Sequence, residues 1–262
     1  MKKIIRILMT LMVILTVVGC DSKTTTQSPK DIYNNAVKAS RNAEYVDMTM
    51  NTNMAFTSTT EGLNMDISMT VDSLSDFSDK DNLKFLFESK SNMFGQETEM
   101  NAYYMDGYTY VEMMGQKLKM KISLEEFQAI AKIETQFIKA EDMSEFSMEE
   151  KDDTYVFTYV ANEEAMMELL KNASGLGDIY GEEMDMQGVK INSMSGTTTI
   201  SKEGEVISEL ISVDANIEES GVTVGFVMNN NTIYNSINEP LDITLPNPDE
   251  YIEMNTEGML IP

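Results

Sequence analysis

The residue with the most distinctive chemistry in this chain is Cys20, the only cysteine in the sequence. A lone thiol cannot form a disulfide within the chain, but as a thiolate it is a nucleophile that can carry a covalent group. Basic residues stand at positions 2, 3 and 6, and a mostly apolar stretch covers residues 4–18, just before Cys20. Such a stretch is short for a membrane-spanning helix and is typical of a signal peptide. The sequence therefore predicts an exported protein whose thiol lies at the processing site.

The segment Val17-Val18-Gly19-Cys20 resembles the lipobox of bacterial lipoproteins, in which an aliphatic residue, a variable position and a small residue precede the cysteine. The resemblance implies a diacylglycerol thioether on Cys20 and removal of residues 1–19 as the signal peptide. Residues 20–29 would then form the lipidated N-terminus and a polar tether. Acyl chains such as palmitate would hold the protein at the outer face of the cell membrane. The alternative is an ordinary signal peptide followed by an incidental cysteine.

The composition excludes several classes of function. The chain has 262 residues, no histidine and a formal net charge of −25 at pH 7. Without histidine, neither His-based catalysis nor a His metal site is available. A surface this acidic repels nucleic acid and anionic lipid headgroups. We therefore expect no nucleic-acid partner, and the charge does not identify a protein partner.

Catalytic motifs are also missing from the sequence, which contains no nucleophile elbow, P-loop or zinc signature. Acidic pairs such as Glu125-Glu126 and Glu163-Glu164 stand in the first turns of predicted helices. Favourable interaction with the helix dipole explains acidic residues at such positions without any chemistry. We therefore expect a protein that is not an enzyme and has no cofactor.

Two kinds of residue cluster could bind metal ions. Soft thioether sulfur favours Cu(I), and methionines cluster in Met48-x-Met50, Met113-Met114 and Met184-x-Met186. Carboxylates favour Ca²⁺, and they cluster at Asp76, Asp79 and Asp81 and at Glu149, Glu150, Asp152 and Asp153. Neither acidic cluster has the EF-hand spacing, and no histidine or free cysteine supports the methionines. We therefore interpret these clusters as packing residues and solvated turns and predict no metal site.

The elements that must position any site follow from the periodicity of the chain. Ser28 and Pro29 are typical of a helix start, and they predict a helix over about 29–42. Asp106-Gly107 predicts a tight hairpin turn. Further helices are expected over about 124–139 and after Asn162, and an extended edge segment over 240–246. A period of two predicts antiparallel strands with one apolar face each, over 46–56, 63–71, 82–93, 97–105, 108–113, 117–122, 155–161, 189–201, 205–218 and 221–234.

This layout resembles the LolA/LppX/LprG-type lipoproteins and, more closely, an uncharacterised family of Gram-positive surface lipoproteins. The resemblance rests on the tethered helix, the strand meander, the mid-chain helices, the hairpin 106–110 followed by Gly115-Gln116-Lys117-Leu118, and the closing Ile243-Thr244-Leu245-Pro246. It implies an α+β fold, in which a strongly curved antiparallel β-sheet forms a half-barrel and helices cover its concave face. A single domain would span residues 30–250, followed by a C-terminal tail at 251–262.

In better-known relatives the space under the helices holds acyl chains, which implies a hydrophobic or amphiphilic, lipid-like ligand here. The sequence contains 24 methionines, and flexible, polarizable methionine suits a pocket for variable aliphatic shapes. The alternative is a surface interaction or sensor module in which methionine fills an ordinary core. The residues predicted to line the cavity are Met48, Met50, Met54, Met65, Ile67, Met69, Phe85, Phe87, Met120, Phe127, Ile130, Val224, Phe226 and Met228.

Overall fold

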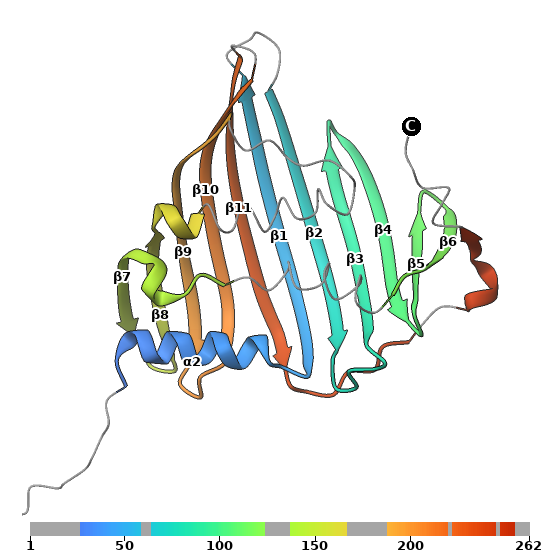
Figure 1. The fold of residues 1–262 in the computed structure, drawn as a ribbon, viewed down its shortest axis with the longest axis horizontal. Helices are drawn as coiled ribbons and strands as arrows, with labels where there is room; N and C mark the ends of the chain where they lie inside the picture. The colour runs from blue at the N-terminus through green and yellow to red at the C-terminus, as the bar shows by residue number, and fades with distance from the viewer. Residues whose placement is uncertain are drawn as a thin grey trace, which may run out of the picture.

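A computed structural model of the chain describes residues 27–58, 64–123, 137–166, 188–219, 222–244 and 247–254. These residues form one sheet of 12 strands in the order β12-β6-β5-β4-β3-β2-β1-β11-β10-β9-β8-β7 (Figure 1). All described neighbours are antiparallel except β12 and β6, which makes the sheet mixed. The strands are β1 (Tyr45–Ser58), β2 (Asn64–Asp76), β3 (Lys84–Met93), β4 (Gln96–Met105), β5 (Tyr108–Met113), β6 (Gln116–Lys121), β7 (Met143–Glu150), β8 (Thr154–Ala161), β9 (Val189–Ser201), β10 (Val206–Glu219), β11 (Val222–Ile237) and β12 (Ile252–Met254).

The alternating pattern identified most of these strands, because side chains of a strand point to opposite faces in turn. Each predicted strand overlaps an observed one. No strand was predicted where β7 lies. This strand contains Glu145, Glu149 and Glu150, and inside it only Phe146 and Met148 are apolar residues that point to the same face, so its alternation is weak. Residues 240–244 of the expected edge segment form no strand, and the two edges of the sheet are β12, which pairs with β6, and β7, which pairs with β8.

Three hairpins turn through two residues with positive φ, the left-handed conformation that favours glycine at the second position. The predicted turn at Asp106-Gly107 is confirmed, with φ of 53° and 77°. Phe94-Gly95 joins β3 to β4 with φ of 56° and 75°, and Met114-Gly115 joins β5 to β6 with φ of 52° and 76°. The first turn lies at the same end of the sheet as the helix α2, and the other two lie at the opposite end (Figure 1).

The predicted N-terminal helix is observed as α2 (Pro29–Arg41). The Ser28 side chain accepts a hydrogen bond from the Asp31 backbone nitrogen, and the Ser28 backbone nitrogen donates one to the Asp31 carboxylate, so a capping box closes the helix start. Tyr33 of α2 is fully buried, and its ring meets the rings of Phe157 and Tyr159 at centroid distances of 5.5 and 6.1 Å. We call the sheet face on which α2 packs the inner face and the opposite one the outer face.

The open, continuous sheet fits the expected half-barrel, but the expected cover of helices is observed only in part. In the figure, α2 crosses the ends of β8 to β10 (Figure 1). The expected helix over about 124–139 lies outside the described residues, except for 137–139, which are not helical. Asn162 caps a helical turn as predicted, because its side-chain oxygen accepts a hydrogen bond from the Ala165 backbone nitrogen at 2.8 Å. Cover of the inner face by further helices therefore stays a prediction.

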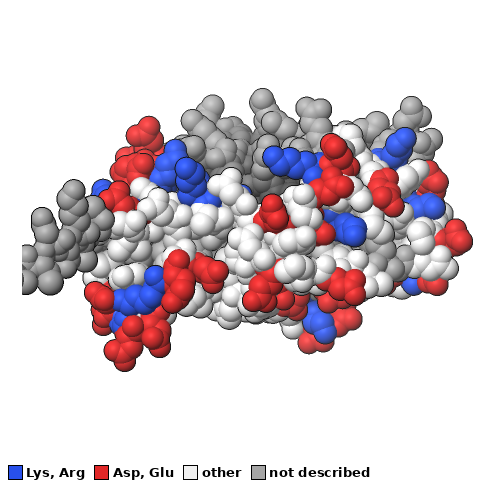
Figure 2. Space-filling model, turned by 90° about the horizontal axis from the view of Figure 1, so that it is seen from below, with Lys and Arg blue, Asp and Glu red and all other residues white. Residues whose placement is uncertain are grey.

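The surface is acidic along its visible length. Figure 2 shows clusters of Asp and Glu side chains spread along the length of the described surface, with Lys and Arg side chains among them. The ion pairs on this surface are partly or fully exposed, as for Lys90 and Glu99 at 3.2 Å, and such pairs contribute little to stability. No helix among the described residues is long and apolar enough to cross a membrane.

Candidate functional site

The strand register gathers the predicted cavity residues on the inner face. Directly paired residues on antiparallel strands point to the same face of a sheet. Met54 on β1 pairs with Met228 on β11 and with Ile67 on β2. Met228 pairs in turn with Val213, which packs against the core beneath α2, so this is the inner face. The same register places all the described candidates on this face: Met48, Met50, Met54, Met65, Ile67, Met69, Phe85, Phe87, Met120, Val224, Phe226 and Met228.

Two adjacent rows of these residues form a continuous apolar surface on three strands. We call it the apolar field and define it as Met54, Phe56, Met65, Ile67, Phe226 and Met228. Within it the rings of Phe56 and Phe226 lie 5.1 Å apart. All six side chains are only partly buried, whereas Tyr33, Phe157 and Tyr159 farther along the same face are 0–1 % exposed. The field is therefore less closely covered than the core beside it.

The other described candidates lie outside the apolar field, and some of them belong to packed clusters. Met48 is 6 % exposed and belongs to a cluster with Ala43 and Val46. Phe85 is 9 % exposed and belongs to a second cluster, against which Phe87 packs. Met120 is half-buried on β6, and Met50, Met69 and Val224 are half-buried beside the field. Cys20, Phe127 and Ile130 lie outside the described residues.

A buried carboxylate on the inner face was not anticipated from the sequence. Glu209 on β10 is 7 % exposed and stands between Thr198 on β9 and Thr232 on β11. The Tyr159 hydroxyl donates a hydrogen bond to Glu209 Oε1 at 3.1 Å. The signal was present, because Glu209 shares its parity with Ile211, Val213 and Ala215, the apolar inward positions of the same strand.

Burial governs the ionisation of this carboxylate. Loss of hydration disfavours the charged form, and it raises the pKa of Glu209 to about 7 against the opposing effects of the Tyr159 hydrogen bond and the Arg41 charge. Gly196 leaves room for the Tyr159 ring, whose hydroxyl reaches Glu209. A Cβ atom at position 196 would lie 2.2 Å from Cζ of the Tyr159 ring, so the ring rests directly against the bare backbone of β9.

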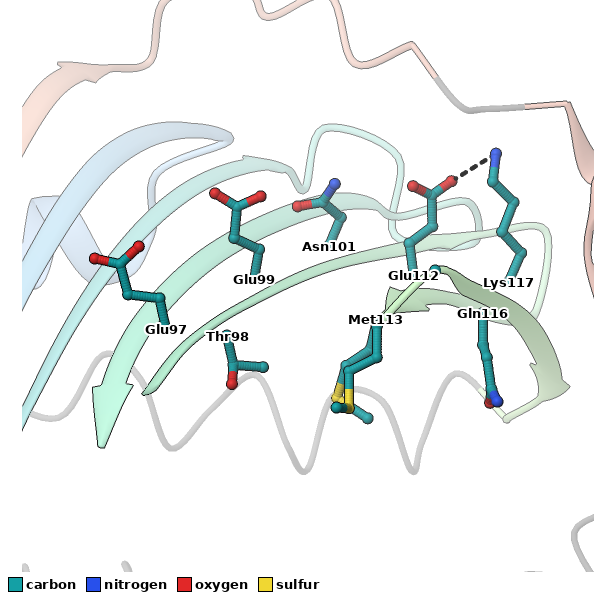
Figure 3. Close-up of a pocket in the computed structure, with 10 residues that line it drawn as sticks. Glu97, Thr98, Glu99, Asn101, Glu112, Met113, Gln116 and Lys117 are labelled. Atoms are coloured by element: carbon teal, nitrogen blue, oxygen red, sulfur yellow. Dashed lines mark ion pairs between the residues drawn. The ribbon is translucent and has the colours of Figure 1, made fainter. Parts of the chain in front are cut away.

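Two of the grooves lined by described residues lie on the sheet, and the smaller one includes Met54 and Ile67 of the apolar field. One of about 410 Å³ lies between the β3–β4 and β5–β6 hairpins. Figure 3 shows Glu97, Glu99, Asn101, Glu112 and Lys117 on one side of these strands and Thr98, Met113 and Gln116 on the other. A second groove of about 310 Å³ includes Asn53, Asp66 and Asn229, which point to the outer face. Both grooves are open and have charged or amide side chains beside apolar ones, unlike the enclosed pocket that usually binds a small molecule.

The metal hypotheses gain no support from the described residues. No cluster of three or more Cys, Asp or Glu side chains there could hold a metal ion. Asp76 accepts hydrogen bonds from the Ser78 nitrogen and hydroxyl, and Asp79 accepts one from the Asp81 nitrogen. These carboxylates thus stabilise turns. Met184 and Met186 lie outside the described residues.

Comparison with protein families identifies the chain. Residues 28–249 match the model of DUF6612, a family of unknown function. The chain belongs to this family. The matched range covers α2 and all the described strands of the sheet except β12. A comparison of this DUF6612 protein with curated proteins found no match.

Solved structures offer only distant similarity to this DUF6612 protein. The crystal structure of LprF from Mycobacterium bovis has 11% sequence identity and a TM-score of 0.47, and the alignment covers 84% of this chain and 96% of LprF. A beta-barrel-like protein of DUF1849 from Brucella abortus has 9% identity and a TM-score of 0.25, covering 74% and 100% of the two chains. A DUF1329 family protein from Desulfovibrio piger has 11% identity and a TM-score of 0.26, covering 79% and 92%. Because all three TM-scores lie below 0.5, we base no functional conclusion on them.

Proposed function

We propose that this protein is a membrane-anchored extracytoplasmic lipoprotein that binds a hydrophobic or amphiphilic, lipid-like ligand on its inner face, without catalysing a reaction. The observation that carries this proposal is the apolar field, whose six large apolar side chains stay partly exposed beside a closely packed core. Covering apolar surface gains about 25 cal/mol per Å². A ligand with an aliphatic chain would therefore gain hydrophobic free energy by lying across β11, β1 and β2.

The described residues on either side of residues 124–136 lie on the inner face of the sheet. Ile122, just after β6, packs against the inner cluster of Phe85 and Tyr104. The described chain resumes at Phe137, which belongs to the inner core under α2. Both ends of the intervening segment thus lie on the inner face. Phe127 and Ile130 lie between these two ends, outside the described residues, and their part in the cavity stays a prediction.

Truncation of methionines in and beside the apolar field tests whether this part of the inner face binds a ligand or is a filled core. Met50→Ala, Met65→Ala and Met69→Ala should each lower the free energy of unfolding by less than about 1 kcal/mol in the ligand-free protein and weaken uptake of a fluorescent fatty-acid probe, because these side chains are only partly buried. Met48→Ala is the matched control. It removes a side chain that is 6 % exposed in a packed cluster and should cost about 2–5 kcal/mol.

Urea denaturation and probe titration measure the two effects separately. If all three variants lose as much stability as Met48→Ala and the wild-type protein binds no probe, the inner face is a filled core. The alternative function, a surface interaction or sensor module, would then be favoured.

The membrane anchor depends on one atom. Cys20→Ser removes the thiol that would accept diacylglycerol, so the variant should accumulate uncleaved or be released from the membrane. Detergent phase partitioning and the mass of the N-terminus measure this outcome. A Cys20→Ser protein that is cleaved after residue 19 and still partitions into detergent would contradict the anchor and leave ligand binding untouched.

A further inference from the structure

The most exposed large apolar side chains of the described residues gather in one corner of the sheet. They are Met114 at 83 %, Phe94 at 72 % and Ile252 at 69 % exposed. Phe94 and Met114 occupy the β3–β4 and β5–β6 turns, and Ile252 lies on β12 at the adjacent edge. We call Phe94, Met114 and their preceding residues Met93 and Met113 the hairpin tips. Met93 and Met113 are themselves 48 % and 44 % exposed, so both tips hold two apolar side chains in contact with water.

Local folding requirements do not explain these residues. A bulky side chain at positive φ is uncommon, and asparagine or aspartate fits that conformation better. The same protein shows the ordinary solution at the β4–β5 turn, where Asp106 adopts a φ of 53°. Phe94 and Met114 adopt nearly the same conformation at the far end of the same sheet. The two tips thus combine an unfavourable conformation with exposure of apolar surface.

The charged side chains near the hairpin tips indicate what charge a binding partner would carry. Glu97, Glu99 and Glu112 line the groove between the hairpins, together with Met113 and Met114. Figure 3 shows the three carboxylates on one side of the strands and Met113 on the other. Lys117 lies 3.2 Å from Glu112 and is also paired with Glu250 at 2.8 Å. Lys90 also pairs with Glu99 at 3.2 Å. Four carboxylates (Glu97, Glu99, Glu112 and Glu250) therefore stand beside two lysines, and an occupant of this corner meets apolar tips beside a small excess of negative charge.

We propose that the hairpin tips form a docking surface for a second protein, which presents an apolar pocket flanked by basic side chains. Apolar anchors at the centre with charged groups at the rim are the usual composition of a protein interface. Anionic lipid headgroups do not fit the negative rim, because like charges repel. Met93 pairs with Ile67 of the apolar field, so this surface adjoins the proposed ligand site, whereas Phe94 and Met114 lie in the turns beyond it.

The test places a photo-crosslinker in the full-length protein on intact cells. Benzoylphenylalanine at position 94 or 114 should give one and the same adduct with another protein, and position 106 serves as the control in the same turn conformation at the other end of the sheet. Charge reversal through Glu97→Lys and Glu99→Lys should reduce the adduct at position 114 at least tenfold. Adducts with lipid only, a dimer of this chain, equal labelling at position 106, or no adduct would each overturn the proposal.

A binding measurement with the purified crosslinked protein completes the test. Phe94→Asn and Met114→Asn should each weaken its binding at least tenfold, while the melting temperature stays unchanged or rises because asparagine tolerates positive φ. Uptake of the fatty-acid probe in the same variants should equal that of the wild type, which separates this inference from the proposed ligand site. Unchanged affinity in both variants would overturn the docking surface.

Discussion

Replacing Glu209 with glutamine should stabilise the protein by about 2–3 kcal/mol at pH 8 and remove the fall in stability that this carboxyl causes between about pH 4.5 and 7.5. Burial raises the pKa of Glu209 to about 7 in the folded protein, well above the value of a carboxyl in an unfolded chain. Its contribution to stability is therefore complete below the unfolded pKa and is lost as the pH rises through 7. Glutamine keeps an oxygen for the Tyr159 hydroxyl and never ionises.

The composition makes this pH window easy to interpret. The chain has no histidine, and burial raises the pKa of Glu209 to about 7. Urea denaturation of the wild type at several pH values should show stability that falls as the pH rises to about 7.5 and then levels off. Glu205→Gln, which changes an exposed glutamate near the start of the same strand, is the control and should keep the wild-type profile. A Glu209→Gln profile parallel to that of the wild type would contradict the assignment.

Replacing Gly196 with alanine should destabilise the protein by about 3 kcal/mol or more, as overpacking of a close interior does. The new Cβ would lie 2.2 Å from the Tyr159 ring, so the ring must leave its place and its hydrogen bond to Glu209 is lost. Alanine is otherwise better than glycine in a strand by about 0.5–1 kcal/mol. A net loss of stability therefore reports the contact with Tyr159.

A double-mutant cycle isolates that contact. In a Tyr159→Ala background the ring is absent, and Gly196→Ala should cost at least about 1 kcal/mol less than in the wild type. At Gly204 an added Cβ atom would have no neighbouring atom within 4 Å, so Gly204→Ala measures the cost of a positive φ alone. Equal losses for Gly196→Ala with and without the Tyr159 ring would show that the ring does not rest on this glycine.

The sheet was largely predictable because its strands are long and amphipathic. In β1 the alternation runs over residues 46–56 with exceptions at Thr52 and Ala55, and in β2 it runs over residues 64–72. A shift by one residue would turn every methionine to the wrong face. The register of the sheet puts Met54, Met65 and Ile67 on one face, as this parity predicts. The hairpin at Asp106-Gly107 was predictable for a local reason, since its residues suit positive φ.

Features that depend on distant contacts were harder to predict. β7 carries too many glutamates for its alternation to stand out, and it is held by pairing with β8. β12 has three residues, and its partner β6 is more than a hundred positions away in the sequence. Glu209 shares its parity with apolar inward residues, but its burial depends on the packing of Tyr159 against Gly196, which is a contact between strands. The turn between β5 and β6 was predicted within one residue of its place at Met114-Gly115, but the positive φ of Phe94 and Met114 is uncommon for such side chains and could not be predicted.

Ligand binding at the inner face is tested most directly by native mass spectrometry of the soluble domain that begins at residue 21, followed by organic extraction. The proposed function predicts protein with an added apolar mass that organic solvent removes. The stripped protein should then bind a fluorescent fatty-acid probe saturably, and the Met50, Met65 and Met69 alanine variants should bind it more weakly. A protein of bare mass that shows no saturable probe binding would contradict the account.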